Sequence, residues 1–101
     1  MEVQITHQND VTTARFIGRL DTPASQEIAP QVEALTEAAD GTVILDCSEM
    51  TYISSSGLRI FLTLRKASSS KGGKIIVKSI NNDIRQVFIM TGFLNLFVIE
   101  D

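Results

Sequence analysis

Residues 53–58 of this chain have the sequence Ile53-Ser54-Ser55-Ser56-Gly57-Leu58. Before them, the apolar run Val43–Leu45 is typical of a short buried strand, and Asp46–Ile53 is predicted as a turn-rich connection. After them, apolar residues recur at helical spacing, which predicts a helix over Ser56–Ser68. The serines therefore lie where a helix begins, at backbone N–H groups without intrahelical partners. One serine suffices as a cap, so three beside a glycine indicate a tip that is phosphorylated or contacts a partner.

The composition is that of an ordinary folded domain. With 101 residues, 44% apolar and 21% charged, the chain is expected to form a single domain over residues 1–101. The net charge of −3 argues against direct nucleic-acid binding, which usually needs a basic stripe. No apolar run approaches the roughly 20 residues needed to cross a bilayer, so membrane insertion is not expected. The single cysteine excludes an internal disulfide and points to a reducing, cytoplasmic setting.

Two strands are predicted at the start of the chain. Apolar and polar residues alternate over Glu2–Thr6, as in a half-buried strand. A turn signal at Asn9–Asp10 precedes a second strand, Val11–Ile17, with Ala14 and Phe16 facing inward. This spacing predicts a hairpin, after which residues 18–21 leave the strand.

A helix follows these strands. Thr22 is the expected N-cap, and Pro23 occupies the first turn, where its missing N–H costs nothing. Pro30 lies inside the helical pattern, so we expect a kink or a split near Ala29.

The rest of the chain alternates strands and helices. A loop is predicted over Ser68–Gly73, a strand over Lys74–Lys78, a helix capped by Asn81 or Asn82 and ended by Gly92, and a last strand over Leu96–Ile99. The order β-β-α-β-α-β-α-β predicts an α/β fold. Its sheet is mixed, with an initial hairpin followed by largely parallel strand–helix units, and the helices pack on the sheet.

Four segments together resemble the STAS domain family (sulfate transporter and anti-sigma factor antagonist), and in particular its small anti-sigma factor antagonists. The segments are Gly18-Arg19-Leu20-Asp21, Val43-Ile44-Leu45-Asp46-Cys47-Ser48, Tyr52-Ile53-Ser54-Ser55-Ser56-Gly57-Leu58 and Met90-Thr91-Gly92-Phe93. They correspond to the family's G-x-L-D, its apolar strand ending in L-D-x-S, its D-S-S-G-L element and the glycine that ends its third helix. They span nearly the whole chain and imply the STAS fold.

The resemblance implies a function and a site. In that family, the serine two positions before the glycine is phosphorylated by a partner that is both an anti-sigma factor and a serine/threonine kinase. A serine phosphatase reverses the modification. Carried over, the acceptor is Ser55, and sigma-factor-dependent transcription is what the switch regulates. Ser54 stands where the family most often has Asp, and it remains a rival acceptor. The partner-binding residues implied are Asp21, Thr22, Ser54, Ser55, Ser56, Gly57 and Arg59. No cofactor is implied.

Each of these residues also has a purely structural interpretation. The serines can be simple N-caps, and Gly57 can serve close backbone approach. Asp21 and Asp46 both follow predicted strands, so both are expected near the serine tip, as turn or cap residues or as partner contacts. Cys47 is expected in the core rather than as a nucleophile, and one His with one Cys makes no zinc set.

The residues suggest two other functions, and the resemblance implies a third. A serine hydrolase is disfavoured, because His7 is the only histidine and Ile53 stands two positions before Ser55, where a nucleophile elbow has Gly. Lys71–Lys74 superficially suggests a phosphate loop, but it precedes a strand rather than a helix. The main alternative is a STAS-type regulatory subunit of a membrane transporter for lipids or anions, which acts by protein–protein binding without phosphorylation.

Overall fold

Five strands form one sheet in the order of the sequence, β1-β2-β3-β4-β5. The computed structural model describes all residues, 1–101. Its elements are β1 (Glu2–Gln8), β2 (Val11–Leu20), α1 (Thr22–Glu27), α2 (Ala29–Glu37), β3 (Thr42–Ile53), α3 (Ser55–Lys71), β4 (Lys74–Lys78), α4 (Asn82–Thr91), the 3-10 helix η1 (Phe93–Asn95) and β5 (Val98–Glu100). β1 and β2 are antiparallel, and every later neighbour is parallel. The predicted α/β class, mixed sheet and opening hairpin are confirmed.

The strand β3 is much longer than predicted. We expected a strand only at Val43–Leu45 and a turn-rich connection at Asp46–Ile53, but β3 runs unbroken from Thr42 to Ile53. β2 pairs with it in parallel as far as Leu20, so residues 18–20 also belong to a strand rather than leaving it. Register shifts in this ladder, one of them after Gly18 (φ +104°), break the simple alternation of apolar and polar residues. The second half of β3 therefore has a sequence typical of a turn, although it forms a strand.

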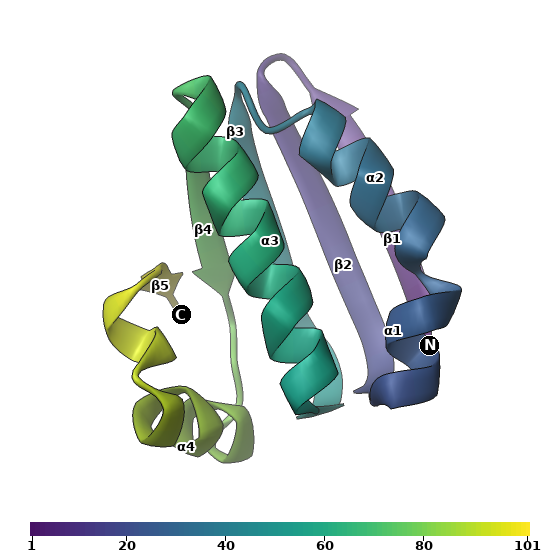
Figure 1. Cartoon of the computed structure of the whole chain (residues 1–101), viewed down its shortest axis with the longest axis vertical. Coiled ribbons are helices and arrows are strands. Elements are labelled where there is room, and N and C mark those ends of the chain that lie inside the picture. Colours follow the sequence, from purple (N-terminus) through teal and green to yellow (C-terminus); the bar gives the residue numbers. More distant parts are fainter.

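Helices cover one face of this sheet. Figure 1 shows α1, α2 and α3 in front of the strands, with α4 at one end of the sheet. Along β3, Val43, Leu45 and Cys47 point into the core, whereas Ile44 on the other face is only half buried. Phe61 of α3 lies at the centre of the core, with its ring centroid 5.5 Å from that of Phe16. The expected packing of helices on the sheet is thus confirmed.

The first helical segment divides at Ile28, close to the predicted split near Ala29 and two residues before Pro30. α1 ends at Glu27 and α2 begins at Ala29, with Ile28 between them. The cap, however, is Asp21 and not Thr22. Asp21 is extended and its Oδ1 accepts a hydrogen bond of 2.9 Å from the Ala24 N–H, while Thr22 is already the first helical residue. The Asp21 carboxylate thus satisfies one of the backbone amides that have no partner within the helix.

The last helices have slightly different ends from those predicted. α3 begins at Ser55 and continues to Lys71, so most of the predicted loop Ser68–Gly73 is helical. Gly72 ends α3 in the left-handed region (φ +73°), and the Gly73 N–H donates to the Ser68 carbonyl at 2.9 Å. For α4, Asn81 rather than Asn82 is the cap, and Gly92 ends the helix as predicted. The final strand is Val98–Glu100, two residues after the predicted start, because residues 93–95 form η1.

Candidate functional site

The predicted serine tip lies at the edge of the sheet where parallel strands end. The last residues of β2 and β3, Leu20 and Ile53, are register partners, and the Ser54 N–H donates to the Leu20 carbonyl at 2.9 Å. The next residue after each strand, Asp21 and Ser54, caps the helix that follows. α1 and α3 consequently begin side by side at this edge (Figure 1).

Ser54 is the N-cap of α3. It is extended (φ −91°, ψ 173°), and its hydroxyl oxygen accepts a hydrogen bond of 3.2 Å from the Gly57 N–H. Its carbonyl accepts from the Leu58 N–H at 2.9 Å, which closes the first helical turn. The Ser54 side chain is half buried. Its hydroxyl therefore already has a structural role, which a serine performs as well as an aspartate.

Ser55 differs from its neighbours in being exposed and unbonded. It is the first residue inside α3, and its hydroxyl makes no hydrogen bond. The next serine, Ser56, is half buried, with its Oγ 3.4 Å from the Thr22 Oγ1 of α1. Of the three hydroxyls, the one at Ser55 is thus the most accessible to another protein.

Gly57 is required by close packing beneath the tip. A Cβ at this position would lie 2.7 Å from Leu20 Cγ and 2.9 Å from Ile53 Cγ1, closer than carbon atoms approach in proteins. Both Leu20 and Ile53 are buried, so neither can move into solvent. The predicted close approach is confirmed, and it seats the start of α3 directly on the ends of β2 and β3.

The charges around the tip are few. Arg59 is exposed, forms no ion pair, and lies one helical turn after Ser55 on the same face of α3. Asp21 and Thr22 also lie at this edge, Asp21 half buried and Thr22 exposed. Asp46 does not, because β3 carries the chain about eight residues, or roughly 26 Å, from Asp46 to the tip. The expectation that Asp46 lies near the serines was wrong, since its strand continues.

Two further contacts at this edge were not foreseen. The amide of Asn81, which caps α4, donates from Nδ2 to the Met50 carbonyl of β3 at 3.1 Å and so attaches the start of α4 to the same end of the sheet. On the open face of the sheet, the Arg19 guanidinium carbon lies 4.3 Å from the centroid of the Tyr52 ring. The sequence signals the Asn81 cap, but nothing in it signals its second bond.

The surroundings of the other candidate residues, Cys47 and His7, favour structural roles. Cys47 is buried in the core, and burial, with a contribution from Asp46, raises the pKa of its thiol far above the ordinary value. His7 lies near the hairpin, at the opposite end of the sheet from Ser55, with its Nδ1 3.0 Å from Thr12 Oγ1. It cannot activate a serine at the tip.

No group of three or more His, Cys, Asp or Glu side chains is placed to hold a metal ion. No helix is long and apolar enough to span a membrane.

Comparisons with known proteins agree with this architecture. A family model described as STAS domain matches residues 2–101. The chain is 26% identical over 102 residues to an anti-sigma F factor antagonist of Paenibacillus polymyxa, an alignment that covers 100% of this chain and 87% of the relative.

Solved structures show the same fold. A protein of Thermotoga maritima matches with a TM-score of 0.88 at 21% identity, over 98% of this chain and 86% of its own. The Bacillus anti-sigma factor antagonist SpoIIAA matches in two forms. The unphosphorylated form has a TM-score of 0.75 at 20% identity, covering 99% of this chain and 88% of its own. The phosphorylated form has a TM-score of 0.74 at 21% identity, covering 97% and 90%.

Proposed function

Because this chain belongs to the STAS domain family, we propose that it is an anti-sigma factor antagonist, a regulator rather than an enzyme. The proposal has support from the name of the Paenibacillus polymyxa relative and from the likeness to SpoIIAA in both phosphorylation states. In this role the unphosphorylated protein binds an anti-sigma factor and so releases a sigma factor for transcription. Phosphorylation abolishes that binding.

The observation that carries the proposal is the contrast between Ser54 and Ser55. Ser54 caps α3 and is half buried, whereas Ser55 is exposed with a free hydroxyl. A kinase needs an accessible hydroxyl that is not already held in a hydrogen bond within the fold, so Ser55 is the acceptor and Ser54 is not. The serine at position 54 keeps the cap that the family's usual aspartate would make.

The switch follows from the charge that phosphorylation adds. A phosphoserine carries about −1.5 to −2 charges at pH 7 and three strong acceptor oxygens. At the start of α3 the helix dipole favours such an anion, so the domain stays folded. A partner surface closed over the neutral hydroxyl would instead face desolvation, and repulsion from any acidic group of its own. Like charges juxtaposed across an interface cost several kcal/mol, and about 1.4 kcal/mol is already tenfold in affinity.

The proposed partner surface is built around that hydroxyl. It comprises Asp21, Thr22, Ser54, Ser55, Ser56 and Arg59, all at the sheet edge where α1 and α3 begin. Gly57, which the resemblance also implied as a partner contact, is buried against Leu20 and Ile53 and supports this surface from beneath. The partner is an anti-sigma factor with serine/threonine kinase activity, and a serine phosphatase restores the unmodified state. The ATP belongs to the kinase, so this chain needs no cofactor. The exchange takes place in the cytoplasm.

Isothermal titration with an anti-sigma factor of the serine/threonine kinase type from the same organism tests the proposal. We expect Ser55→Ala to bind about as tightly as the unmodified protein and Ser55→Asp to bind at least tenfold more weakly. The matched control is Ser70→Asp, which adds the same charge to an exposed serine of the same helix, about four turns away. Equal affinity of Ser55→Asp and the unmodified protein, or equal weakening by Ser70→Asp, would overturn the proposal.

A transporter-bound regulatory subunit would behave differently. It would bind its transporter without modification and gain no mass when incubated with the kinase and ATP. A gain of one phosphate in an intact-mass measurement therefore separates the two functions.

A further inference from the structure

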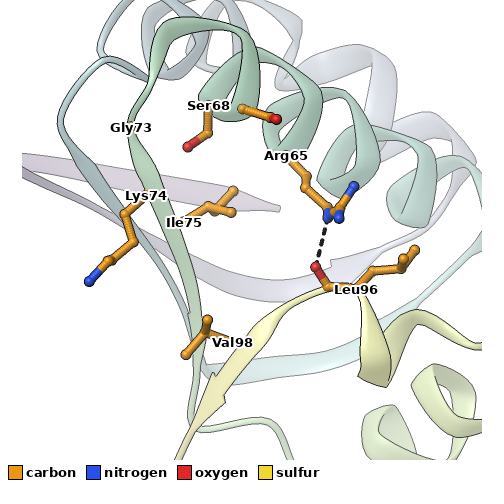
Figure 2. Close-up of a pocket in the computed structure, with 8 residues that line it drawn as sticks. Arg65, Ser68, Gly73, Lys74, Ile75, Leu96 and Val98 are labelled. Atoms are coloured by element: carbon orange, nitrogen blue, oxygen red, sulfur yellow. Dashed lines mark hydrogen bonds between the residues drawn. The ribbon is translucent and has the colours of Figure 1, made fainter.

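A cavity of about 250 Å³ lies at the far end of α3 from the serine tip. It is bounded by the last turns of α3, the start of β4 and the chain entering β5 (Figure 2). β5 pairs only with Ile76–Lys78, so the first two residues of β4 have no strand beside them on this side, and a gap remains. At 1.5 Å per residue, Ser55 and Ser68 lie about 20 Å apart along α3. The cavity is therefore separate from the proposed partner surface.

Ser68 supplies an unpaired hydroxyl to this cavity. The residue is 98% buried, since only 2% of it is exposed, yet its side chain forms no hydrogen bond. Figure 2 shows it projecting from α3 toward β4. The only side-chain polar atom fully enclosed without a partner is Gln31 Oε1, so the Ser68 oxygen keeps access to the cavity. The hydroxyl is therefore free to bond an oxygen atom of a ligand that enters the cavity in place of water.

Arg65 supplies a positioned positive charge. Its Nε donates to the Leu96 carbonyl at 2.7 Å, drawn as the dashed line in Figure 2. The two terminal nitrogens of its guanidinium have no partner, and neither ion pair of the protein involves Arg65. A guanidinium held in this way presents a fork of N–H groups that suits carboxylate or phosphate oxygens. Its bond to Leu96 also reduces the entropy lost when a ligand binds.

The remaining walls favour an anion with an apolar part. No acidic residue lines the cavity, although the whole chain carries a net charge of −3. Lys74 adds a second cation at the rim, with its ammonium turned outward in Figure 2. The end of α3 contributes only about half a negative charge, less than the full charge of Arg65. Apolar surface comes from Ile75, Leu96 and Val98.

We propose that this cavity binds a small organic oxyanion, a carboxylate or a phosphate monoester. The anionic group contacts the free nitrogens of Arg65 and the hydroxyl of Ser68, and the apolar part packs on Ile75 and Val98. The volume is slightly below the roughly 300–1,000 Å³ of typical small-molecule sites, so the ligand is small.

An NMR titration of the ¹⁵N-labelled full chain tests this site, with phenyl phosphate, benzoate and the neutral benzyl alcohol as probes at constant ionic strength. We expect at least one of the two anions to shift the amide signals of Ser68, Ser69 and Gly73 saturably, and benzyl alcohol not to. Arg65→Gln should raise the Kd at least tenfold. Ser68→Ala should raise it at least threefold without lowering the unfolding midpoint, which keeps the test valid if Arg65→Gln unfolds.

The matched control is Lys66→Gln, which removes an exposed charge beside Arg65 but does not line the cavity. We expect it to leave the Kd unchanged. The proposal is overturned if neither anion saturates, if benzyl alcohol binds equally well, if Ser68→Ala binds as the unmodified protein does, or if Lys66→Gln weakens binding as much as Arg65→Gln. Neither a kinase nor an anti-sigma factor is present, so the result is independent of the proposed function.

Discussion

Phosphorylation of Ser55 should stabilise the domain rather than loosen it. The phosphate would sit at the first residue of α3, where the helix dipole contributes about 0.3–1 kcal/mol for an exposed anion. Arg59, one turn further along the same face, would add about 0.2–0.5 kcal/mol. Together these give roughly 0.5–1.5 kcal/mol. For a domain of this size, 1 kcal/mol raises Tm by about 4–8 °C, so an increase of roughly 2–12 °C is expected.

Scanning calorimetry of the fully phosphorylated and unmodified proteins measures this difference directly. The increase should shrink in 1 M salt, where the Debye length falls to about 3 Å. Arg59→Gln should remove part of it, and phosphatase treatment should remove all of it. A Tm that falls on phosphorylation, or a transition that loses its cooperativity, would refute the reasoning, because the charge would then disrupt the fold rather than the partner surface.

Substitutions at three other positions test the surroundings of the tip and the core. Ser54→Ala should lower the free energy of unfolding in urea by about 1 kcal/mol, and Ser54→Asp should match or slightly exceed the unmodified protein, because only the alanine removes the cap. Gly57→Ala should destabilise by about 1–2 kcal/mol in the same assay, since crowding against Leu20 costs more than the roughly 1 kcal/mol gained in helix propensity; an unchanged midpoint would contradict the close approach. For Cys47, burial raises the folded pKa, so only the unfolded thiol ionises above its ordinary value of 9.0. Stability should then fall by about 1.4 kcal/mol per pH unit above pH 9 relative to Cys47→Ala, and parallel pH profiles would contradict this.

Much of the fold could be predicted because local signals agree with the tertiary structure. Pro30 divides the first helical segment, and Gly92 ends α4, because both residues act on the backbone itself. The second half of β3 could not be predicted. Its polar residues lie on a sheet face that no helix covers, and the register shifts with β2 hide the alternation. The length of β3 is set by its pairing with β2, a strand distant in the sequence, and no local pattern of residues records that pairing.

In the candidate site, too, some features could be predicted from the sequence and others could not. The run of serines and Gly57 marks the start of a helix, so the place of the tip could be predicted from the sequence. Which serine caps the helix and which one is free depends on the exact residue at which β3 ends, and this follows from the pairing of Ile53 with Leu20. The error over Asp46 has the same cause, because a strand predicted too short places that carboxylate too near the tip.

The most direct test of the account is to locate the phosphate after incubation with the kinase-type anti-sigma factor and ATP. Fragmentation mass spectrometry of the unmodified chain should find one phosphate, on Ser55, and the same gain in mass should occur with Ser54→Ala but not with Ser55→Ala. Phosphate on Ser54 in the unmodified chain, or an undiminished gain in mass with Ser55→Ala, would contradict the claim that Ser55 is the hydroxyl open to modification.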